Sequence, residues 1–595
     1  MSANIHMKDP ICLIENRNGH EFLINAEAEE ILSQITDPVV VVVIVGKYRT
    51  GKSYLMNKLA GSKTGFQLGS TIQSKTKGIW MWCVPHPRKP SHTLVLLDTE
   101  GLGDIEKGDS KNDAWIFSLA VLLSSNLVYN SMGTIDNHAM EQLHYVTNLT
   151  NLIKLKTNPE GEEKNESSEF KRIFPSFTWC VRDFSLALEI DEKEITEDEY
   201  LMNSLRLKKG TDKKIQDYNL PRECILHYFH SHKCFVFDRP SATRNLRRLE
   251  ELEERDLEKE FVEQTQKFCD YIHKQGIVKT LPGGLLVTGR MLAYLVNLYL
   301  ETIKSGSVPC IENAVLALSV IENTGAVQDA LKMYETCMND QVAGFPTETL
   351  ETFLQMHQDC EKEALKVFLK RSFNDENQKF QQEFKVRTID GKMKEFSTLN
   401  ENKSTEHCQI IIQQLSAALD QRISQRKFLK PGGYMLFLEE KRTIMAKYDT
   451  APNKGLKSLE VLQEFMNNLK VIEATILQAD ESLTAKEKQI AESQAEAEAA
   501  KRQRQILEEQ ARSLQESLEN QKKSYEQHEK MLIEKMESDR RNLIAENERM
   551  IDQKLQEQSA MLTAGHQSNV NALQGEINGL KGKNRDILLL PCVIS

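Results

Sequence analysis

The sequence predicts an α/β nucleotide-binding domain followed by an all-α region that forms a helical bundle and a long C-terminal helix. Three observations carry this prediction. An apolar strand runs into a glycine-rich loop near the N-terminus, strand-like and helical stretches alternate up to about residue 310, and strand-like segments nearly vanish beyond residue 311. The 595 residues exceed what one core organises, so two or three domains are expected.

The strongest motif is a phosphate-binding loop. The run Val39–Val45 contains only strand-forming residues, and the next eight residues, Gly46–Ser53, fit the pattern G-x-x-x-x-G-K-S before an apolar helical segment. In such a loop backbone N–H groups surround the α- and β-phosphates, Lys52 reaches the β- and γ-phosphates, and the Ser53 hydroxyl binds Mg²⁺. We therefore predict a nucleoside triphosphate site with Mg²⁺ as its cofactor.

A second motif supplies the acid that such sites require on a neighbouring strand. Thr93–Leu97 is another apolar strand, and it ends in Asp98-Thr-Glu-Gly101, which has the spacing D-x-x-G. Asp98 is predicted to reach the metal through water, and the Gly101 N–H to approach the γ-phosphate. The alternative, that Asp98 is only a strand-end turn residue, loses weight beside the glycine loop.

The local sequence pattern does not by itself identify which nucleotide base the site recognises. The guanine signature N-K-x-D is absent, but Asp183 follows the apolar stretch Phe177–Val181. Its carboxylate could accept two hydrogen bonds from the N1–H and N2–H₂ of guanine, which adenine does not offer. The competing interpretation makes Arg182 and Asp183 an ordinary surface ion pair.

Four segments closely resemble the guanylate-binding proteins, the interferon-inducible large GTPases of the dynamin superfamily: Tyr48–Asn57, Ser74–Trp82, Leu97–Gly103 and Val181–Phe184. The likeness extends to Pro431–Tyr434 and to the C-terminus. It implies an α/β P-loop GTPase domain that hydrolyses GTP to GDP, with turnover stimulated by homodimerisation of these domains. It also implies larger oligomers, hetero-oligomers with relatives, and in some members a second cleavage to GMP.

The resemblance also assigns roles to particular residues. Arg49 would be an arginine finger within the loop, although a solvated loop arginine is the alternative. Ser74 would position the attacking water, Glu100 would join the water network, and Thr76 would complete the Mg²⁺ shell with Ser53 and, through water, Asp98. The nucleotide-contacting set would be Gly46, Lys47, Tyr48, Arg49, Thr50, Gly51, Lys52, Ser53, Tyr54, Asp98, Thr99, Glu100, Gly101, Arg182 and Asp183, with Arg239 and Pro240 capping the base.

Two positions depart from the family pattern. Cys180 stands where relatives often have threonine, which leaves the base-reading Asp183 in place. Lys75 stands where some relatives have histidine, and an added cation near the phosphates bears on the second cleavage. No side chain is a strong general base, which fits catalysis by positioning and electrostatics.

Composition narrows the classes of function. The chain carries 76 basic and 87 acidic residues, a net charge of −11, which argues against nucleic acid as a partner. No apolar run reaches the length of a membrane span, and the N-terminus lacks a signal core. The eleven cysteines have no C-x-x-C pairs or histidine spacing, so we expect no zinc site and no disulfide framework; ten are interpreted as reduced thiols of a cytoplasmic protein.

We expect three regions: a GTPase domain over residues 1–310, a helical middle domain over 311–480, and a long-helix region over 481–595. The last contains most of a stretch of 109 residues without glycine or proline, between Gly455 and Gly565, with a sparse apolar stripe. One interpretation is a coiled-coil dimer. The other is a helix that folds back along the bundle and is released when GTP binds.

The chain ends in Cys592-Val-Ile-Ser595, a C-a-a-X box that predicts farnesylation of Cys592. One lipid gives only marginal membrane binding, so a second signal such as multivalent assembly is needed. We expect prenyl-dependent association with Golgi, vesicles or pathogen vacuoles and, following the family, a role in cell-autonomous defence. The alternatives are a GTP-switched adaptor and a coiled-coil scaffold with an inactive head.

Overall fold

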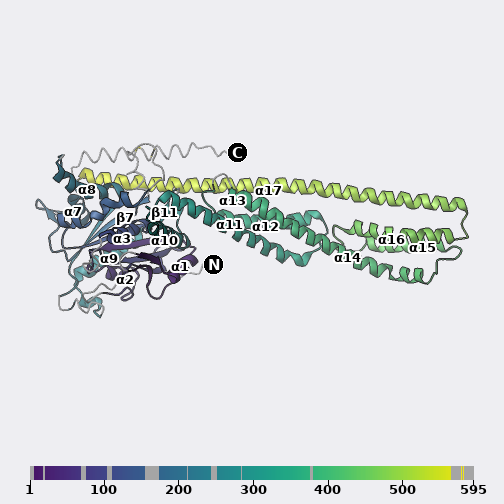
Figure 1. Ribbon diagram of the computed structural model, residues 1–595, viewed down its shortest axis with the longest axis horizontal. Helices are drawn as coiled ribbons and strands as arrows, with labels where there is room; N and C mark the ends of the chain where they lie inside the picture. Colours follow the sequence, from purple (N-terminus) through teal and green to yellow (C-terminus); the bar gives the residue numbers. More distant parts are fainter. Residues whose placement is uncertain are drawn as a thin grey trace. The chain divides into compact units, whose positions relative to one another are not determined.

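The computed structural model describes residues 6–17, 21–68, 76–103, 110–154, 173–210, 212–242, 245, 251–282, 284–375, 379–563, 578 and 581. It divides into two compact units. The α/β unit comprises residues 1–318 and 537–595, and the helical unit comprises residues 319–536 (Figure 1).

An eight-stranded sheet forms the centre of the α/β unit. Its strands are β1 (Ile11–Arg17), β2 (Glu21–Ile24), β3 (Val39–Gly46), β4 (Ile79–Pro85), β5 (Thr93–Thr99), β6 (Asn126–Met132), β7 (Ser176–Arg182) and β10 (His232–Phe237). They lie in the order β10-β7-β6-β3-β5-β4-β1-β2. The first five in this order are parallel, whereas β4, β1 and β2 are added antiparallel to their neighbours. Strand β3 is buried along its whole length, which explains its unbroken apolar sequence.

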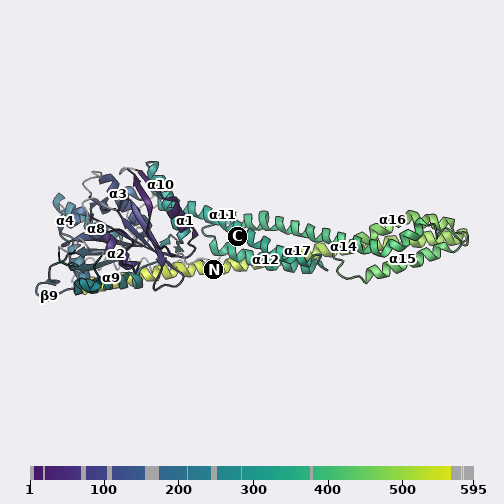
Figure 2. The same cartoon turned by 90° about the horizontal axis from the view of Figure 1, so that it is seen from below.

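Helices cover both faces of this sheet. Figure 2 shows α2 (Lys52–Leu59) and α9 (Lys259–Gln275) on one face and α3 (Ser110–Leu123) and α10 (Gly289–Lys304) on the other. The remaining elements of the unit are α1 (Ala26–Gln34), α4 (Asn137–Gln142), η1 (His144–Asn148), α5 (Leu149–Leu152), β8 (Glu189–Ile190), β9 (Lys193–Glu194), α7 (Glu197–Ser204), α8 (Lys213–Tyr228), η3 (Glu254–Asp256), β11 (Thr280–Leu281) and β12 (Leu285–Leu286). This layered arrangement leaves the carboxyl ends of β3, β5, β6, β7 and β10 at one edge, where ligands bind in open parallel sheets.

Among its described residues, the helical unit contains only helices and the loops that connect them. The helices are most of α11 (Ile311–Gln341), η4 (Val342–Gly344), α12 (Leu350–Arg371), α13 (Lys379–Gln382), the π-helical η6 (Glu383–Ile389), α14 (Asp390–Ser424), α15 (Gly433–Asp449), α16 (Ser458–Ala479) and part of α17 (Ala485–Thr563). Three clusters of buried apolar residues hold them together. The predicted fold class, an α/β P-loop domain followed by a helical region, is confirmed.

The family-like segment Pro431–Tyr434 starts helix α15. Gly432 has a φ of 76°, which favours glycine. The Asp480 carboxylate, at the end of α16, accepts hydrogen bonds from the backbone N–H groups of Gly432 (2.9 Å) and Tyr434 (3.0 Å). Desolvation would raise the pKa of Asp480, but a hydrogen bond from the Ser482 hydroxyl and the N–H groups of Tyr434, Gly432 and Ser482 together lower it to about 2. The carboxylate therefore fixes where α15 begins.

Helix α17 is a single helix of 79 residues. Inside the helical unit it packs on its own chain: Lys385 Nζ donates to Ser524 Oγ (3.1 Å), and Ser524 Oγ donates to Glu361 Oε2 (2.7 Å). This agrees with the folded-back helix that was one of the two sequence interpretations. Part of the apolar stripe nevertheless stays exposed, since Leu514 is 66% and Leu518 60% accessible.

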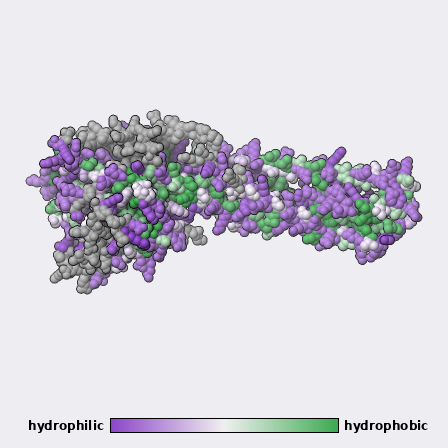
Figure 3. Space-filling model, viewed as in Figure 1, coloured by the Kyte–Doolittle hydropathy of each residue, from purple (hydrophilic) through white to green (hydrophobic). Residues whose placement is uncertain are grey.

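The visible face of the helical unit is mostly hydrophilic, with hydrophobic residues in separate groups (Figure 3). No helix among the described residues combines the length and the apolarity that a membrane-spanning segment needs.

The cysteine prediction is wrong for one pair. Cys337 and Cys360 form a disulfide between α11 and α12, with their Cα atoms 5.6 Å apart. Sequence spacing could not reveal this pairing, because it depends on how two helices pack. On α12, three residues before Cys360, the ring Nδ1 of His357 shares a hydrogen bond with Tyr334 Oη at 2.9 Å. No group of three or more metal-binding side chains occurs among the described residues.

Candidate nucleotide-binding site

The loop Gly46–Ser53 joins β3 to α2 at the carboxyl edge of the sheet. Gly46 has a φ of 147°, and a Cβ there would lie 2.1 Å from the Asn130 carbonyl oxygen. Gly51 caps α2 with a φ of 81°. The backbone conformation therefore requires glycine at both positions. The loop leads directly into the N-terminus of α2, where free backbone N–H groups are suited to bind phosphate.

Lys52 lies at the centre of this loop. Its ammonium donates to the carbonyl oxygens of Gly46 (3.2 Å) and Lys47 (3.0 Å), and the residue is only 7% exposed. Burial lowers the pKa of Lys52 to about 8, while the nearby carboxylates of Asp98 and Glu100 oppose that shift. A phosphate oxygen in the loop would supply the negative charge that stabilises this buried ammonium.

Asp98 has the arrangement expected of a residue near Mg²⁺. Its Oδ2 accepts a short hydrogen bond of 2.6 Å from Ser53 Oγ, whereas its buried Oδ1 has no hydrogen-bond partner among the described residues. Burial raises the pKa of Asp98 to about 6, partly offset by Lys52 and by the Ser53 hydrogen bond. An unpaired buried carboxylate oxygen beside a hydroxyl is a suitable environment for hydrated Mg²⁺, so these residues fit the predicted cofactor.

Among the described residues, three donors hold the Glu100 carboxylate. Its Oε1 accepts from the side-chain amides of Asn16 (2.7 Å) and Asn112 (3.0 Å), and its Oε2 accepts from the Gly78 N–H (2.6 Å). The residue is fully buried. These bonds connect the end of β5 to β1, to α3 and to the segment that precedes β4. The Glu100 side chain is therefore held in one position beside the D-x-x-G motif, Asp98–Gly101.

Gly101 lies directly against the phosphate-binding loop. A Cβ at this position would approach Tyr48 Cβ to 2.3 Å and the Tyr48 backbone nitrogen to 2.6 Å. The next residue, Leu102, donates its N–H to the Gly46 carbonyl (3.0 Å). The two motifs predicted from the sequence therefore meet, and a side chain at Gly101 would separate them.

Arg182 is buried below the loop. It is 4% exposed, and its guanidinium carbon lies 4.9 Å and 5.1 Å from the ring centroids of Phe237 and Phe261. Its Nη2 would be 3.4 Å from a Cβ at Gly51. Burial excludes the solvated surface pair and gives Arg182 a position supporting the loop, with aromatic faces stabilising the charge.

Asp183 and the predicted base cap lie at the same edge. Asp183 is half-buried, directly after β7, with a φ of 52°. Phe184 donates its N–H to the Phe237 carbonyl (2.9 Å), which brings the ends of β7 and β10 together. Just beyond β10, Arg239 is exposed and Pro240 is buried.

Of the remaining predicted residues, some lie within the described part of the chain and others lie outside it. Arg49 is exposed, with a φ of 64° and its guanidinium 6.0 Å from the Tyr48 ring centroid. Thr76 is half-buried just before β4. Ser74 and Lys75, as well as the lipidation candidate Cys592, lie outside the described residues.

Motif analysis missed three asparagines that organise the site. Asn16 and Asn112 hold Glu100, and Asn130 Nδ2 donates to the Thr50 carbonyl of the loop (2.7 Å). The only sequence signal was a polar residue inside an apolar strand or helix, as at Asn130 in β6. Such a residue must find a buried partner, but the sequence does not identify that partner.

Together, the parallel sheet, the glycine loop at its carboxyl edge, the buried lysine and the serine–aspartate pair define a P-loop nucleoside triphosphate-binding domain. Comparison with known proteins gives the family. The model of the guanylate-binding protein N-terminal domain matches residues 19–281, and that of the C-terminal domain matches residues 283–581. The chain belongs to the guanylate-binding protein family.

Individual relatives agree over most of the chain. Guanylate-binding protein 7 of Homo sapiens is 50% identical over 582 residues, covering 98% of this chain and 91% of the relative. Guanylate-binding protein 1 of Mus musculus is 53% identical over 500 residues, covering 84% of each. Guanylate-binding protein 1 of Chlorocebus aethiops is 51% identical over 509 residues, covering 86% of each.

Proposed function

We propose that this protein is a GTPase that hydrolyses GTP to GDP with Mg²⁺. The observation that carries the proposal is the trio of buried Lys52, half-buried Ser53 and buried Asp98, in which the ammonium, a hydroxyl and a carboxylate with one unpaired oxygen meet at the glycine loop. Membership of the guanylate-binding protein family supports the choice of guanine nucleotide and of hydrolysis.

The chain's own residues would act mainly by positioning and by electrostatics. The loop N–H groups and Lys52 hold the phosphates, and Ser53, Thr76 and, through water, Asp98 hold Mg²⁺. Bound Mg²⁺ would neutralise charge on the phosphate oxygens. Arg49, exposed on the loop, is free to swing toward the transferring phosphoryl as an arginine finger, and Ser74 would orient the attacking water.

Glu100 has a positioning role in this scheme. Because its carboxylate is held by Asn16, Asn112 and Gly78, the backbone of Gly101 is held beside Tyr48 and the loop. That arrangement presents the Gly101 N–H toward the γ-phosphate and orders the water that Glu100 can reach. A preorganised site of this kind needs no strong general base.

Base selection is assigned to Asp183. Its half-buried carboxylate at the end of β7 would accept hydrogen bonds from guanine N1–H and N2–H₂, with Arg182 beneath the loop and Arg239-Pro240 near the base. Asp183→Asn tests this assignment, since an amide would donate to the 2-oxygen of xanthine. We expect the variant to lose at least tenfold in GTP affinity and to gain affinity for xanthosine triphosphate; unchanged GTP preference would remove Asp183 from base recognition.

The finer functional proposals follow the family. Turnover would be stimulated by homodimerisation through the GTPase domains, with larger oligomers and hetero-oligomers with relatives. The cycle would release the folded-back part of α17 and assemble the protein on membranes through a prenyl group on Cys592, in interferon-induced cell-autonomous defence. The protein would be cytoplasmic with reversible association with Golgi, vesicles or pathogen vacuoles, and GMP would be a further product.

One experiment tests the catalytic proposal first. The purified full chain is incubated with GTP and Mg²⁺ at a series of protein concentrations, and products are separated by chromatography. We expect GDP, with specific activity rising with protein concentration, and Lys52→Ala as the inactive control. No GDP or GMP at any concentration would contradict the enzyme proposal.

The adaptor alternative is tested with Arg49→Ala. This variant should bind GTP but turn it over slowly, and its activity in a cellular defence assay separates the two functions. Defence without turnover would favour the adaptor.

A further inference from the structure

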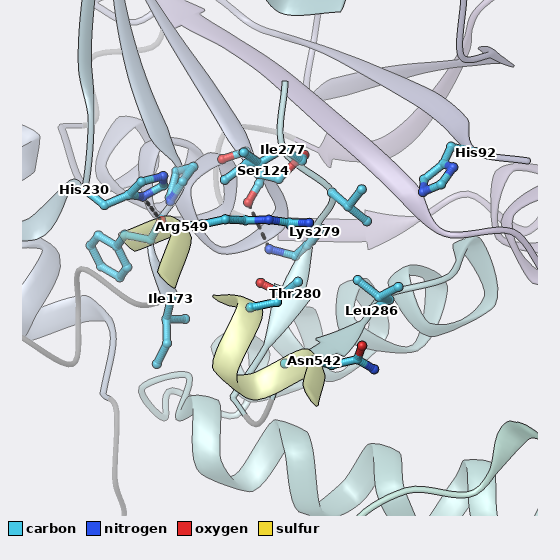
Figure 4. Close-up of a pocket in the computed structure, with 16 residues that line it drawn as sticks. His92, Ser124, Ile173, His230, Ile277, Lys279, Thr280, Leu286, Asn542 and Arg549 are labelled. Carbon is cyan, nitrogen blue, oxygen red and sulfur yellow. Dashed lines mark hydrogen bonds between the residues drawn. The ribbon is translucent and has the colours of Figure 1, made fainter. Parts of the chain in front are cut away.

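A cavity lies at the edge of the sheet opposite to the phosphate-binding loop. It has a volume of about 290 Å³, close to the lower end of small-molecule pockets. Its walls come from the residues just before β6, β7 and β10, from the Ile277–Thr280 segment, and from one face of α17 (Figure 4). The strands that separate it from the nucleotide site are six to eight residues long, or roughly 20–25 Å.

The lining of this cavity carries positive charge without acids. Lys279, Arg549, His92 and His230 contribute basic groups, and no aspartate or glutamate is among the lining residues. Figure 4 shows the side chains of Lys279 and Arg549 pointing into the same space. In a chain of net charge −11, basic groups gathered without counter-charges are a local feature that requires an explanation.

Lys279 is the deepest of these groups. It is 4% exposed, and its ammonium donates to the Ser124 carbonyl (2.9 Å). The other two N–H groups of this ammonium have no acceptor among the described residues. Burial lowers the pKa of Lys279 to about 7, because no carboxylate compensates for the lost hydration. A buried cation with unused donors is the kind of group that an anionic ligand would satisfy.

Helix α17 supplies the other side of the cavity. Asn542, Ala545 and Arg549 lie on one face of the helix, three and seven residues apart. Arg549 is exposed and has no acidic partner among the described residues, and its charge also lowers the pKa of Lys89, which is already lowered by desolvation. A ligand between Lys279 and Arg549 would replace repulsion between cations by attraction on both sides.

We propose that this cavity is a binding site for a small soluble molecule that carries more than one phosphate group, held between Lys279 and Arg549. The guanidinium and ammonium are the two side-chain groups best suited to phosphate oxygens. The size of the cavity favours an organic phosphate over a single phosphate ion. Because the ligand contacts both the α/β core and α17, its binding stabilises the docked position of this end of the helix.

The probe is inositol 1,4,5-trisphosphate, titrated calorimetrically into the full chain with the nucleotide site saturated by GDP and Mg²⁺. Saturable binding at one site is expected, and unphosphorylated myo-inositol should give no binding. Arg549→Gln should weaken binding at least tenfold, which corresponds to about 1.4 kcal/mol. Arg541→Gln, which removes the same charge from an exposed position on the same helix, should change affinity less than twofold.

Three results would overturn the proposal: no saturable binding up to about 1 mM probe, equal affinity in wild type and Arg549→Gln, or equal weakening by Arg541→Gln. Lys279→Met, which keeps the side-chain volume, should also weaken binding tenfold; if it does not fold, Arg549→Gln decides alone.

Protonation supplies a readout that general electrostatic attraction to the surface would not give. An anion raises the pKa of Lys279, so this residue should take up a proton when the probe binds near pH 7. The phosphate groups of the probe also titrate between pH 8 and 6, so the contribution of Lys279 is the difference in proton uptake between wild type and Lys279→Met. The other titratable groups facing Lys279 in the cavity are His92, His230 and Arg549. Lys279→Met should reduce the measured proton uptake; unchanged uptake would contradict the role of Lys279.

Discussion

Replacing Asn130 by alanine removes a side-chain amide that holds the phosphate-binding loop from below. Asn130 is fully buried at the carboxyl half of β6, and its Nδ2 donates to the Thr50 carbonyl at 2.7 Å. In the alanine variant that carbonyl is left without its buried donor. The loss of such a partner costs about 1–3 kcal/mol, and the cavity left by the amide adds to it.

The effect should appear in both stability and nucleotide binding. We expect the unfolding free energy to fall by about 2 kcal/mol. Thr50 then keeps only its own hydroxyl bond to the Lys47 carbonyl, so the nucleotide must supply part of the ordering of the loop. The dissociation constant for GTP should therefore rise about tenfold, or about 1.4 kcal/mol. Asn130→Asp keeps the shape but turns an acceptor toward the carbonyl, and should be worse than alanine.

The assay is titration of a fluorescent GTP analogue into each variant, together with urea unfolding followed by circular dichroism. Asn402→Ala, at an exposed position on α14, is the matched control and should change neither quantity appreciably. If Asn130→Ala binds GTP as the wild type does and unfolds at the same urea concentration, the proposed support of Thr50 is refuted.

Three further predictions concern Gly101 of the D-x-x-G motif, the metal site and the helical unit. Gly101→Ala should lower GTP turnover at least tenfold, since its Cβ would collide with Tyr48. Gly344→Ala is the control and should leave turnover unchanged, because a Cβ there meets no neighbour. Equal turnover rates in Gly101→Ala and the wild type would contradict the Gly101–Tyr48 contact. Burial raises the pKa of Asp98 to about 6, so protonation of Asp98 should add to the loss of Mg²⁺ affinity of the GTP complex in acid. Asp98→Asn should bind Mg²⁺ weakly and with a smaller pH dependence than the wild type. For stability the sign is opposite: Asp98 binds a proton more tightly in the folded protein than at its ordinary pKa of 3.8, so its contribution is lost as the pH rises through about 6. Peptide mapping without reductant should recover Cys337 joined to Cys360, and breaking this bond should destabilise the helical unit by about 3 kcal/mol; separate thiols in unreduced protein would contradict the structure.

The fold class and the centre of the site were predictable because their signals are local. An all-apolar run followed by glycine, lysine and serine at fixed spacing can form only a few structures, and the strand before Asp98 follows the same rule. Both strands and the loop occur as predicted. No glycine-lysine motif marks β1, β2 or β4, and their antiparallel pairing at one edge of the sheet was not predicted.

The sequence by itself determined that Gly46–Ser53 is a phosphate-binding loop, that Asp98 lies beside it, and that a helical region follows. Only the tertiary structure decided which asparagine meets which partner, that Arg182 packs against both Phe237 and Phe261, and that Lys279 and Arg549 line one cavity. The physical reason is the separation along the sequence of the residues that interact. Loop conformation and strand burial depend on neighbouring residues, whereas buried hydrogen bonds, charge clusters and the Cys337–Cys360 bond join residues 12 to 270 positions apart, and their pairing is set by how whole elements pack.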